Sequence, residues 1–211
     1  MPFESPDWPL AELLSDIDKG SIQLPDFQRE WKWDVDRIQS LLASVALGHP
    51  VGVVMMLENG SSEVNFATRE IAGAPSASAD PERLLLDGQQ RLTSLYQTLF
   101  SGRAVDTADV RGKQMTVWFY MDIAASVDEN ADLEDDGIVH VPEDRILRSD
   151  FGRRIDADYS SLEREAKAGV FPLTRAFDPD FLFDFNDALR EHRPDLDSAF
   201  KLFRNGPLKQ I

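Results

Sequence analysis

The sequence predicts an α/β fold (α+β) in which a mixed sheet is flanked by helices, and three observations support this prediction. Apolar residues recur at helical spacing within residues 10–17 and 38–46. Three apolar runs, at residues 51–57, 83–86 and 114–121, have the length of strands. The second of these runs passes through a glycine directly into a polar helical stretch, so helices and strands alternate along the chain.

The first expected helix presents an apolar stripe and ends at a glycine. Gly20 stands where a C-terminal cap belongs, and a short strand at residues 21–24 follows it. The stripe consists of Leu10, Leu13, Leu14 and Ile17.

A second helix is expected to begin at Asp34, whose side chain suits an N-cap, and to end at Gly48. Its stripe consists of Ile38, Leu41, Leu42, Val45 and Ala46. The following run, residues 51–57, is interpreted as a buried strand.

The centre of the chain is expected to connect a loop, a strand and a helix. Residues 73–81 are rich in Ala, Ser and Pro and predict a flexible connection. A strand at residues 83–86 then enters the sheet, and residues 88–100 form the next helix. Residues 114–121 give the clearest later strand.

An acidic stretch at residues 122–137 raises the question of a metal site. It lacks the glycine position and ligand spacing of an EF-hand loop, so a solvated hairpin or linker is expected instead. A strand at residues 138–141 and helices at residues 160–168 and 179–191 follow. We therefore expect a core at residues 1–125 and, at residues 126–211, an acidic linker with a small helical C-terminal extension. The chain is expected to be a truncated or stand-alone N-terminal region.

Composition narrows the class of protein. The chain has 211 residues, 42% of them hydrophobic, and 13 phenylalanines, which is enough to bury a substantial core. The lack of cysteine excludes disulfides, thiolate zinc sites and a cysteine nucleophile. No apolar run approaches a membrane span, and residues 1–5 do not resemble a signal peptide, so no membrane partner and a cytoplasmic location are expected.

The net charge of −16 argues against a uniformly DNA-binding surface, because phosphate contacts require clustered Lys and Arg. Any nucleic-acid contact is therefore expected to be local. The charge is interpreted first as a feature of the solvated surface.

The strand-to-helix junction around Gly88 has the chemistry of an anion site. The first N–H groups of a helix lack partners within the helix, and the helix dipole favours a negative ligand there. Gly88 permits close approach, while Gln89, Gln90 and Arg91 supply donors for phosphate oxygens. In the simpler alternative, Asp87 caps the helix and Arg91 pairs with a carboxylate.

A second cluster at residues 23–34 contains another Gln-Arg pair, Gln28-Arg29, and two tryptophans. Arg29 suits a phosphate clamp, and its alternative is an ion pair with Glu30 or Asp34. Gln28 is suited to orienting a water or contacting a base, and its alternative is a hydrogen bond that orders the loop.

Three other residues have alternatives of their own. Trp31 suits stacking on a base, whereas core packing is preferred for Trp33. Thr93 is suited to a phosphate or a metal-bound water, and its alternative is a bond back to the preceding helical turn.

Two familiar catalytic motifs are missing from the sequence. It contains no Gly-x-x-x-x-Gly-Lys-Ser/Thr phosphate-binding loop and no recognisable His-Asn-His nuclease element.

Three motifs taken in order carry a family resemblance. They are Leu-Pro-x-Phe-Gln-Arg-x-x-x-Trp-Asp at residues 24–34, Gly48-x-Pro50-x-Gly52, and Asp87-Gly-Gln-Gln-Arg-Leu-Thr93. Together they resemble the N-terminal domain of GmrSD-type restriction proteins, which act on modified DNA in bacterial and archaeal anti-phage defence. This domain is related in fold to the ParB/sulfiredoxin nucleotide-binding superfamily.

The resemblance implies an NTPase (hydrolase) that binds Mg²⁺ and a nucleoside triphosphate. In this interpretation Asp87, Gln90 and Arg91 are catalytic, Asp87 also holds the metal, and Gln28, Arg29, Gly88, Gln89 and Thr93 bind the nucleotide. Modified DNA is expected to bind through a local or an additional surface of the protein. A homo-oligomer or a C-terminal nuclease domain is the other expected partner. The alternative is a non-catalytic module that senses modified DNA or binds another protein.

Overall fold

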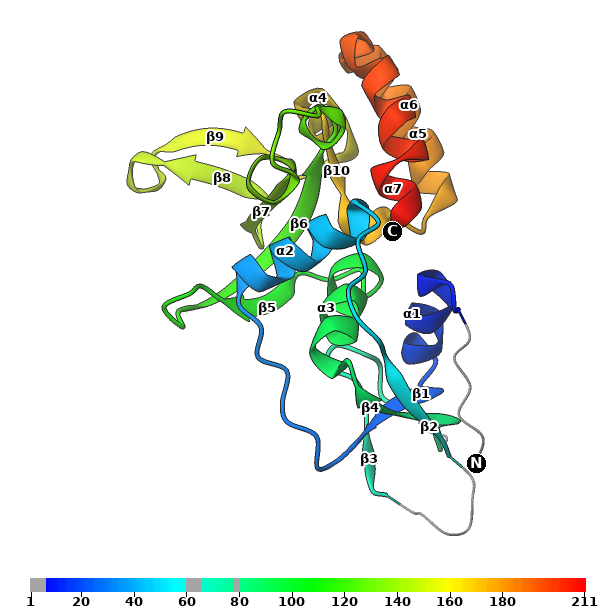
Figure 1. Cartoon of the computed structure of the whole chain (residues 1–211). Helices are drawn as coiled ribbons and strands as arrows, with labels where there is room; N and C mark the ends of the chain where they lie inside the picture. Colours follow the sequence, from blue (N-terminus) through cyan, green and yellow to red (C-terminus); the bar gives the residue numbers. More distant parts are fainter. Residues whose placement is uncertain (1–6, 60–65, 78–79) are drawn as a thin grey trace. The chain divides into compact units, whose positions relative to one another are not determined.

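The computed structural model describes residues 7–59, 66–77 and 80–211 (Figure 1). The chain divides into two compact units. The first unit comprises Met1–Trp31 and Val53–Tyr96, and the second comprises Lys32–Gly52 and Gln97–Ile211. The predicted α/β class is confirmed.

The first unit is built on a four-stranded mixed sheet. Its elements are α1 (Leu10–Asp18), β1 (Ile22–Pro25), β2 (Met55–Glu58), β3 (Thr68–Arg69), β4 (Arg83–Asp87) and the first part of α3 (Gln89–Leu99). The strand order is β2-β4-β1-β3. β1 and β4 are parallel, whereas β2 and β3 are antiparallel to their neighbours. Because β1 and β4 are adjacent and parallel, the segments that leave them start from the same edge of the sheet.

Local signals predicted most of these elements correctly. α1 is followed by Gly20 with φ of +77°, as expected of a helix end. The strand expected at residues 83–86 and the helix expected at residues 88–100 are confirmed as β4 and α3. Their core contains Leu14, Ile17, Ile22, Leu24, Leu84 and Leu85, each almost fully buried.

The buried strand expected at residues 51–57 is wrong. Only Met55–Glu58 forms a strand, β2, and Val53 and Met55 are 72% and 48% exposed. β2 is the end strand of its sheet, and its register with β4 shifts between Met55 and Met56. An end strand is paired on one side only, so an apolar run there need not be buried.

The second unit contains an antiparallel sheet and most of the helices. Its strands are β5 (Val105–Ala108), β6 (Gln114–Asp122), β7 (Ile138–Pro142) and β10 (Val170–Pro172), with a separate hairpin of β8 (Ile146–Ser149) and β9 (Arg154–Asp158). Its helices are α2 (Val35–Ala46), the end of α3, α4 (Leu162–Ala168), α5 (Pro179–His192), α6 (Asp197–Asn205) and α7 (Pro207–Gln210). Short helical turns are η1 (Ala125–Val127), η2 (Leu133–Gly137), η3 (Asp150–Gly152), η4 (Leu173–Arg175) and η5 (Pro194–Leu196).

The N-cap expected at Asp34 is confirmed, because its side chain accepts a hydrogen bond from the Arg37 N–H at 2.9 Å. The helical C-terminal extension is also confirmed, although α6 and α7 were not anticipated. Phenylalanines from β10, α5 and α6 form its core, with ring centroids 5.3 to 5.9 Å apart. They are Phe171, Phe181, Phe185, Phe200 and Phe203.

The acidic stretch is not a hairpin. It contains the turns η1 and η2, although its acidic side chains from residue 128 onward are exposed as expected. Leu133 is only 7% exposed, and the Gln39 side chain donates to the Glu134 carbonyl at 2.5 Å, so the segment is anchored to α2. β6 pairs with β7 and β10 across residue 125, and the domain boundary expected there stays a prediction.

Two further expectations concern connections and membranes. In the predicted connection at residues 73–81, residues 78 and 79 lie outside the described residues, and the others form neither helix nor strand. None of the helices in the described ranges has both the length and the apolar character needed to cross a bilayer.

Candidate functional site

The candidate site is the junction of β4 and α3 in the first unit. Gly88 joins the two elements with φ of +91°, a conformation that L side chains rarely adopt. A Cβ there would lie 3.2 Å from Val54 Cγ2 and 3.4 Å from Val54 Cα. The junction therefore requires glycine for two reasons, backbone conformation and the closeness of Val54.

Side-chain amides fasten the segment after β1 to this junction. We call this segment, residues 26–31, the Gln-Arg loop. Gln28 Nε2 donates to the Leu86 carbonyl at 2.8 Å, Gln89 Nε2 to the Arg29 carbonyl at 2.6 Å, and Gln90 Nε2 to the Glu30 carbonyl at 3.1 Å. The two Gln-Arg segments, about 60 residues apart in sequence, thus adjoin in the first unit.

Two residues that the sequence did not single out complete this attachment. Arg69, in β3, donates from Nη2 to the carbonyls of Gln28 and Arg29 at 2.9 and 3.0 Å. Ser94 Oγ accepts from the Trp31 indole N–H at 3.0 Å. Arg69 lies in a two-residue strand without a motif around it, so no local signal could have identified its role.

The amides therefore have a structural use. For Gln28 the geometry matches the loop-ordering alternative, and Gln89 and Gln90 bond to carbonyls in the same way. Gln28 and Gln89 each have a second amide hydrogen and an amide oxygen that can accept, so these two side chains retain capacity for a ligand. Trp31 is oriented by its bond to Ser94, and Trp33 is half-buried with its carbonyl accepting from Thr107 Oγ1 at 2.6 Å.

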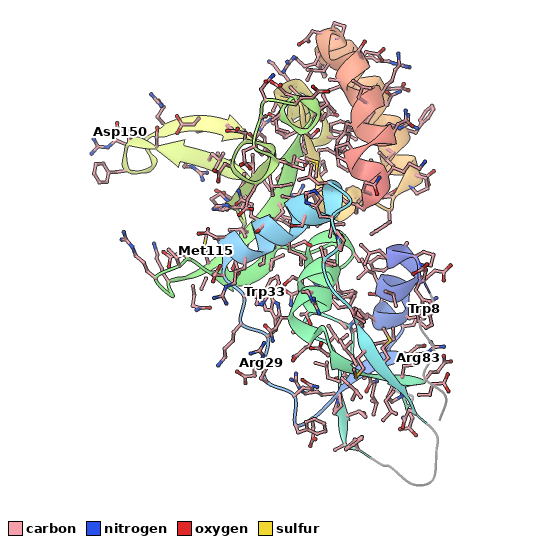
Figure 2. All side chains as sticks on the ribbon, viewed as in Figure 1. Trp8, Arg29, Trp33, Arg83, Met115 and Asp150 are labelled. Atoms are coloured by element: carbon pink, nitrogen blue, oxygen red, sulfur yellow. The ribbon has the colours of Figure 1, made fainter. Side chains whose placement is uncertain are left out.

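The two arginines differ in their surroundings. Arg91 is half-buried and donates from Nη2 to the Val53 carbonyl at 2.8 Å. Arg29 is exposed, on the connection between β1 and α2 in Figure 2, and its guanidinium makes no ion pair within the described residues. The ion pair with Asp34 offered as an alternative for Arg29 is made by Arg37 instead, at 3.4 Å. The exposed Arg29 is thus available for an anion.

Asp87 is exposed at the end of β4. Its carboxylate makes no hydrogen bond or ion pair with any residue that the structure describes, so the helix-cap alternative is not realised. Among the residues that the structure describes, no three or more His, Asp or Glu side chains are grouped so that they could hold a metal. A cation at Asp87 would therefore need its other ligands from water or from a bound phosphate.

Thr93 lies one turn into α3 and is fully buried. Its Oγ1 has no hydrogen-bond partner in the described structure, so the back-bond to the preceding turn is not made either. An unsatisfied buried hydroxyl disfavours the fold by about 1–3 kcal/mol. This orphaned oxygen is unusual, because buried polar groups in proteins are almost always paired.

The family match extends well beyond these motifs. The model of the family described as "GmrSD restriction endonuclease, N-terminal domain" matches residues 10–205. The chain is also similar to an uncharacterized protein of Methanocaldococcus jannaschii, with 34% identity over 97 residues. That match covers 44% of this chain and only 17% of the relative, so the relative is much longer than the matched part.

Proposed function

The chain belongs to the family of N-terminal domains of GmrSD restriction endonucleases, and on that premise we propose that it binds and hydrolyses a nucleoside triphosphate with Mg²⁺ during restriction of modified foreign DNA. The observation that carries the proposal is the fastening of the Gln-Arg loop to the β4–α3 junction. It brings a segment with an unpaired arginine to the start of a helix, where anions are favoured.

The residues at the junction fit a polyphosphate. Arg29 is exposed and unpaired within the described residues, and the start of α3 contributes backbone N–H groups. The backbone at Gly88 already lies close to Val54, so the glycine keeps the junction tight. The orphaned Thr93 hydroxyl is a further polar group in the same helix that a ligand or water would satisfy.

Each charged side chain has a distinct role in this proposal. Arg29 neutralises phosphate charge, and Asp87 holds the metal through water or orients the attacking water. Bound Mg²⁺ would supply charge neutralisation at the phosphates. Arg91 has a positioning role. Its hydrogen bond to the Val53 carbonyl holds the segment before β2 at the junction.

Nucleotide binding tests this proposal directly. Purified protein is titrated with labelled ATP, GTP and CTP in the presence of Mg²⁺, and Arg29→Ala is compared with Arg111→Ala, an exposed arginine in the second unit. Losing a charge-assisted phosphate contact should weaken binding about tenfold or more in Arg29→Ala and leave Arg111→Ala near the wild type. Equal affinities for the two variants would remove Arg29 from the site.

A second function is favoured by the engagement of Gln28, Gln89 and Gln90 in ordering the loop. A rigid, non-catalytic site of this kind would sense modified DNA without turnover, with Trp31 stacking on a base. Phosphate release with and without modified DNA separates the two functions. Release that disappears in Asp87→Asn supports the hydrolase, and DNA binding with no release supports the sensor.

A further inference from the structure

The hairpin β8–β9 in the second unit forms a sheet of its own. Its two strands pair only with each other in the described structure, from Ile146 opposite Asp158 to Ser149 opposite Arg154. Figure 1 shows this ribbon extending beyond the β5–β6–β7 sheet of the same unit, and Figure 2 shows Asp150 at its tip. A narrow two-stranded ribbon of this kind fits into a groove of duplex nucleic acid.

The tip of the hairpin has an unusual backbone. Asp150, Phe151 and Gly152 have φ of +50°, +54° and +85°, so three consecutive residues are left-handed. This conformation is uncommon for residues other than glycine and is a true outlier for a bulky side chain. Strain of this kind is concentrated at sites of function.

No packing contact within the described part of the fold offsets the backbone strain at Phe151. Its side chain is 102% exposed, so the ring packs against no core, and it lies in a turn of three left-handed residues. Asparagine, which tolerates left-handed backbone, would suit the turn better. Because neither packing nor backbone conformation favours phenylalanine at this position, the ring is available for a contact outside the chain.

Charge at the hairpin is balanced, unlike that of the whole chain, and the tip carries one unpaired carboxylate, Asp150, and one unpaired guanidinium, Arg153, among the described residues. The chain carries a net charge of −16, yet residues 144–158 contain four arginines and four aspartates and are neutral. Arg148 pairs with Asp144 and Arg154 pairs with Asp156, whereas the Arg153 guanidinium makes no ion pair with a described residue. An unpaired cation two residues after an exposed aromatic ring matches a phosphate backbone beside a base step.

We propose that the β8–β9 tip contacts duplex DNA, with Phe151 inserted against a base step in the minor groove and Arg153 on an adjoining phosphate. Apolar wedges, phenylalanine among them, act in this way in proteins that bend DNA. The contact is local, which reconciles DNA binding with an acidic protein. The proposal rests on the DNA-directed part of the proposed function and is independent of nucleotide hydrolysis.

The test compares two exposed phenylalanines of the second unit in the whole chain. Phe151→Asn removes the ring and suits the turn, while Phe183→Asn removes a ring that is 68% exposed on α5. Binding of a fluorescent unmodified duplex is followed by anisotropy at about 50 mM salt, where phosphate contacts are strong. A second duplex containing 2-aminopurine reports unstacking. Phe151→Asn should weaken binding about tenfold and abolish the fluorescence rise, whereas Phe183→Asn should do neither.

The contribution of Arg153 is read from the salt dependence. Arg153→Gln should lower the slope of log affinity against log salt by about one, as expected for one lost phosphate contact. Equal binding by the two phenylalanine variants, or no duplex binding by the unaltered chain, would overturn the proposal. So would sedimentation showing that Phe151→Asn instead dissociates a dimer, which would make the tip a protein contact.

Nucleotide titration of the same proteins separates this proposal from the previous one. Phe151→Asn should bind nucleotide like the wild type. A wild type that binds duplex through Phe151 but binds no nucleotide would reject the NTPase and retain the hairpin, and the reverse result would reject only the hairpin.

Discussion

The two units differ in whether all their buried polar side chains have hydrogen-bond partners. In the first unit Thr93 is fully buried, and its hydroxyl has no partner in the described structure. In the second unit Thr107 is 4% exposed, and its hydroxyl donates to the Trp33 carbonyl. Glu165 in the second unit is 2% exposed and accepts from the Tyr120 hydroxyl at 3.1 Å. The second unit satisfies its buried polar groups, whereas the first leaves one open beside the candidate site.

The Glu165 group shows how complete this satisfaction is. Arg145 lies 3.6 Å from the same carboxylate oxygen and stacks 4.1 Å from the centre of the Trp118 ring. Burial raises the pKa of Glu165 to about 7, while Tyr120 and Arg145 act in the opposite direction. The pKa of Tyr120 is raised, first by burial and then by the neighbouring carboxylate. The Glu165 carboxyl is therefore engaged by two neighbours, while burial disfavours its ionised form.

Removing Glu165 should have the largest effect. Glu165→Ala leaves Arg145 without its buried carboxylate and Tyr120 with only the Tyr159 carbonyl, 3.4 Å away, as acceptor, and should lower the free energy of unfolding by about 4 kcal/mol. The control is Glu163→Ala, an exposed position on the same helix, which should change it by less than about 1 kcal/mol. Urea denaturation measures both. Equal losses would mean that the buried group contributes no more than a surface acid.

The pH dependence of the free energy of unfolding tests the effect of burying Glu165. The folded pKa of Glu165, about 7, lies above its ordinary value of 4.5, so the folded protein binds the proton more tightly than the unfolded chain. The stabilisation that this tighter proton binding adds to the free energy of unfolding is complete below about pH 4.5. It is lost as pH rises through about 7, a change of about 3 kcal/mol. Glu165→Gln should remove it. The difference in unfolding free energy between the two proteins, measured from about pH 5 to about pH 8, isolates this group. A difference independent of pH would refute the shift.

Glycine substitutions compare the tight junction with an open turn. Gly88→Ala brings a Cβ to 3.2 Å from Val54 and should lower the unfolding free energy by about 3 kcal/mol. Gly112→Ala, at φ of +80° with nothing within 4 Å, should lose only about 1 kcal/mol from the backbone conformation. Thermal denaturation measures the two. If both variants lose the same amount, the close approach of Val54 does not matter.

The two threonines give the smallest but most direct comparison. Thr93→Val removes an unpaired hydroxyl and should leave stability unchanged or raise it by about 1 kcal/mol. Thr107→Val removes the donor to the Trp33 carbonyl and should lower stability by about 1 kcal/mol. Losses of the same size at both positions would show that Thr93 has a partner after all. If the Thr93 hydroxyl serves a ligand, Thr93→Val should also weaken nucleotide binding.

Elements with strong local signals were predicted, and elements that depend on distant partners were not. Residues close in sequence determine three of these features: the Asp34 cap, the apolar stripe of α2, and the passage from β4 through Gly88 into α3. β5, β10 and the β8–β9 hairpin were missed because short strands are defined by the strands that they pair with. β2 was extended too far for the same reason.

The candidate site divides in the same way. The sequence identified Gln28, Arg29, Gly88 and Asp87 as polar or flexible residues in two motifs, but it left open whether each contacts a ligand or the protein. Hydrogen bonds from Gln28, Gln89 and Gln90 to distant carbonyls settled where these amides point. Arg69 could not be foreseen, because its role depends on a carbonyl pair some 40 residues away.

The sequence by itself determined the helix ends, the glycine turn before α3, the acidic surface and the motifs that identify the family, because each depends on residues within a few positions of one another. Only the tertiary structure decided that the Gln-Arg loop is bound to the helix start, that the side chains of Arg29 and Asp87 lack partners among the described residues, and that Phe151 stands exposed on a strained turn. The reason is physical. Hydrogen bonding and burial depend on which groups contact each other in the folded chain, and the spacing of residues in the sequence does not specify those contacts.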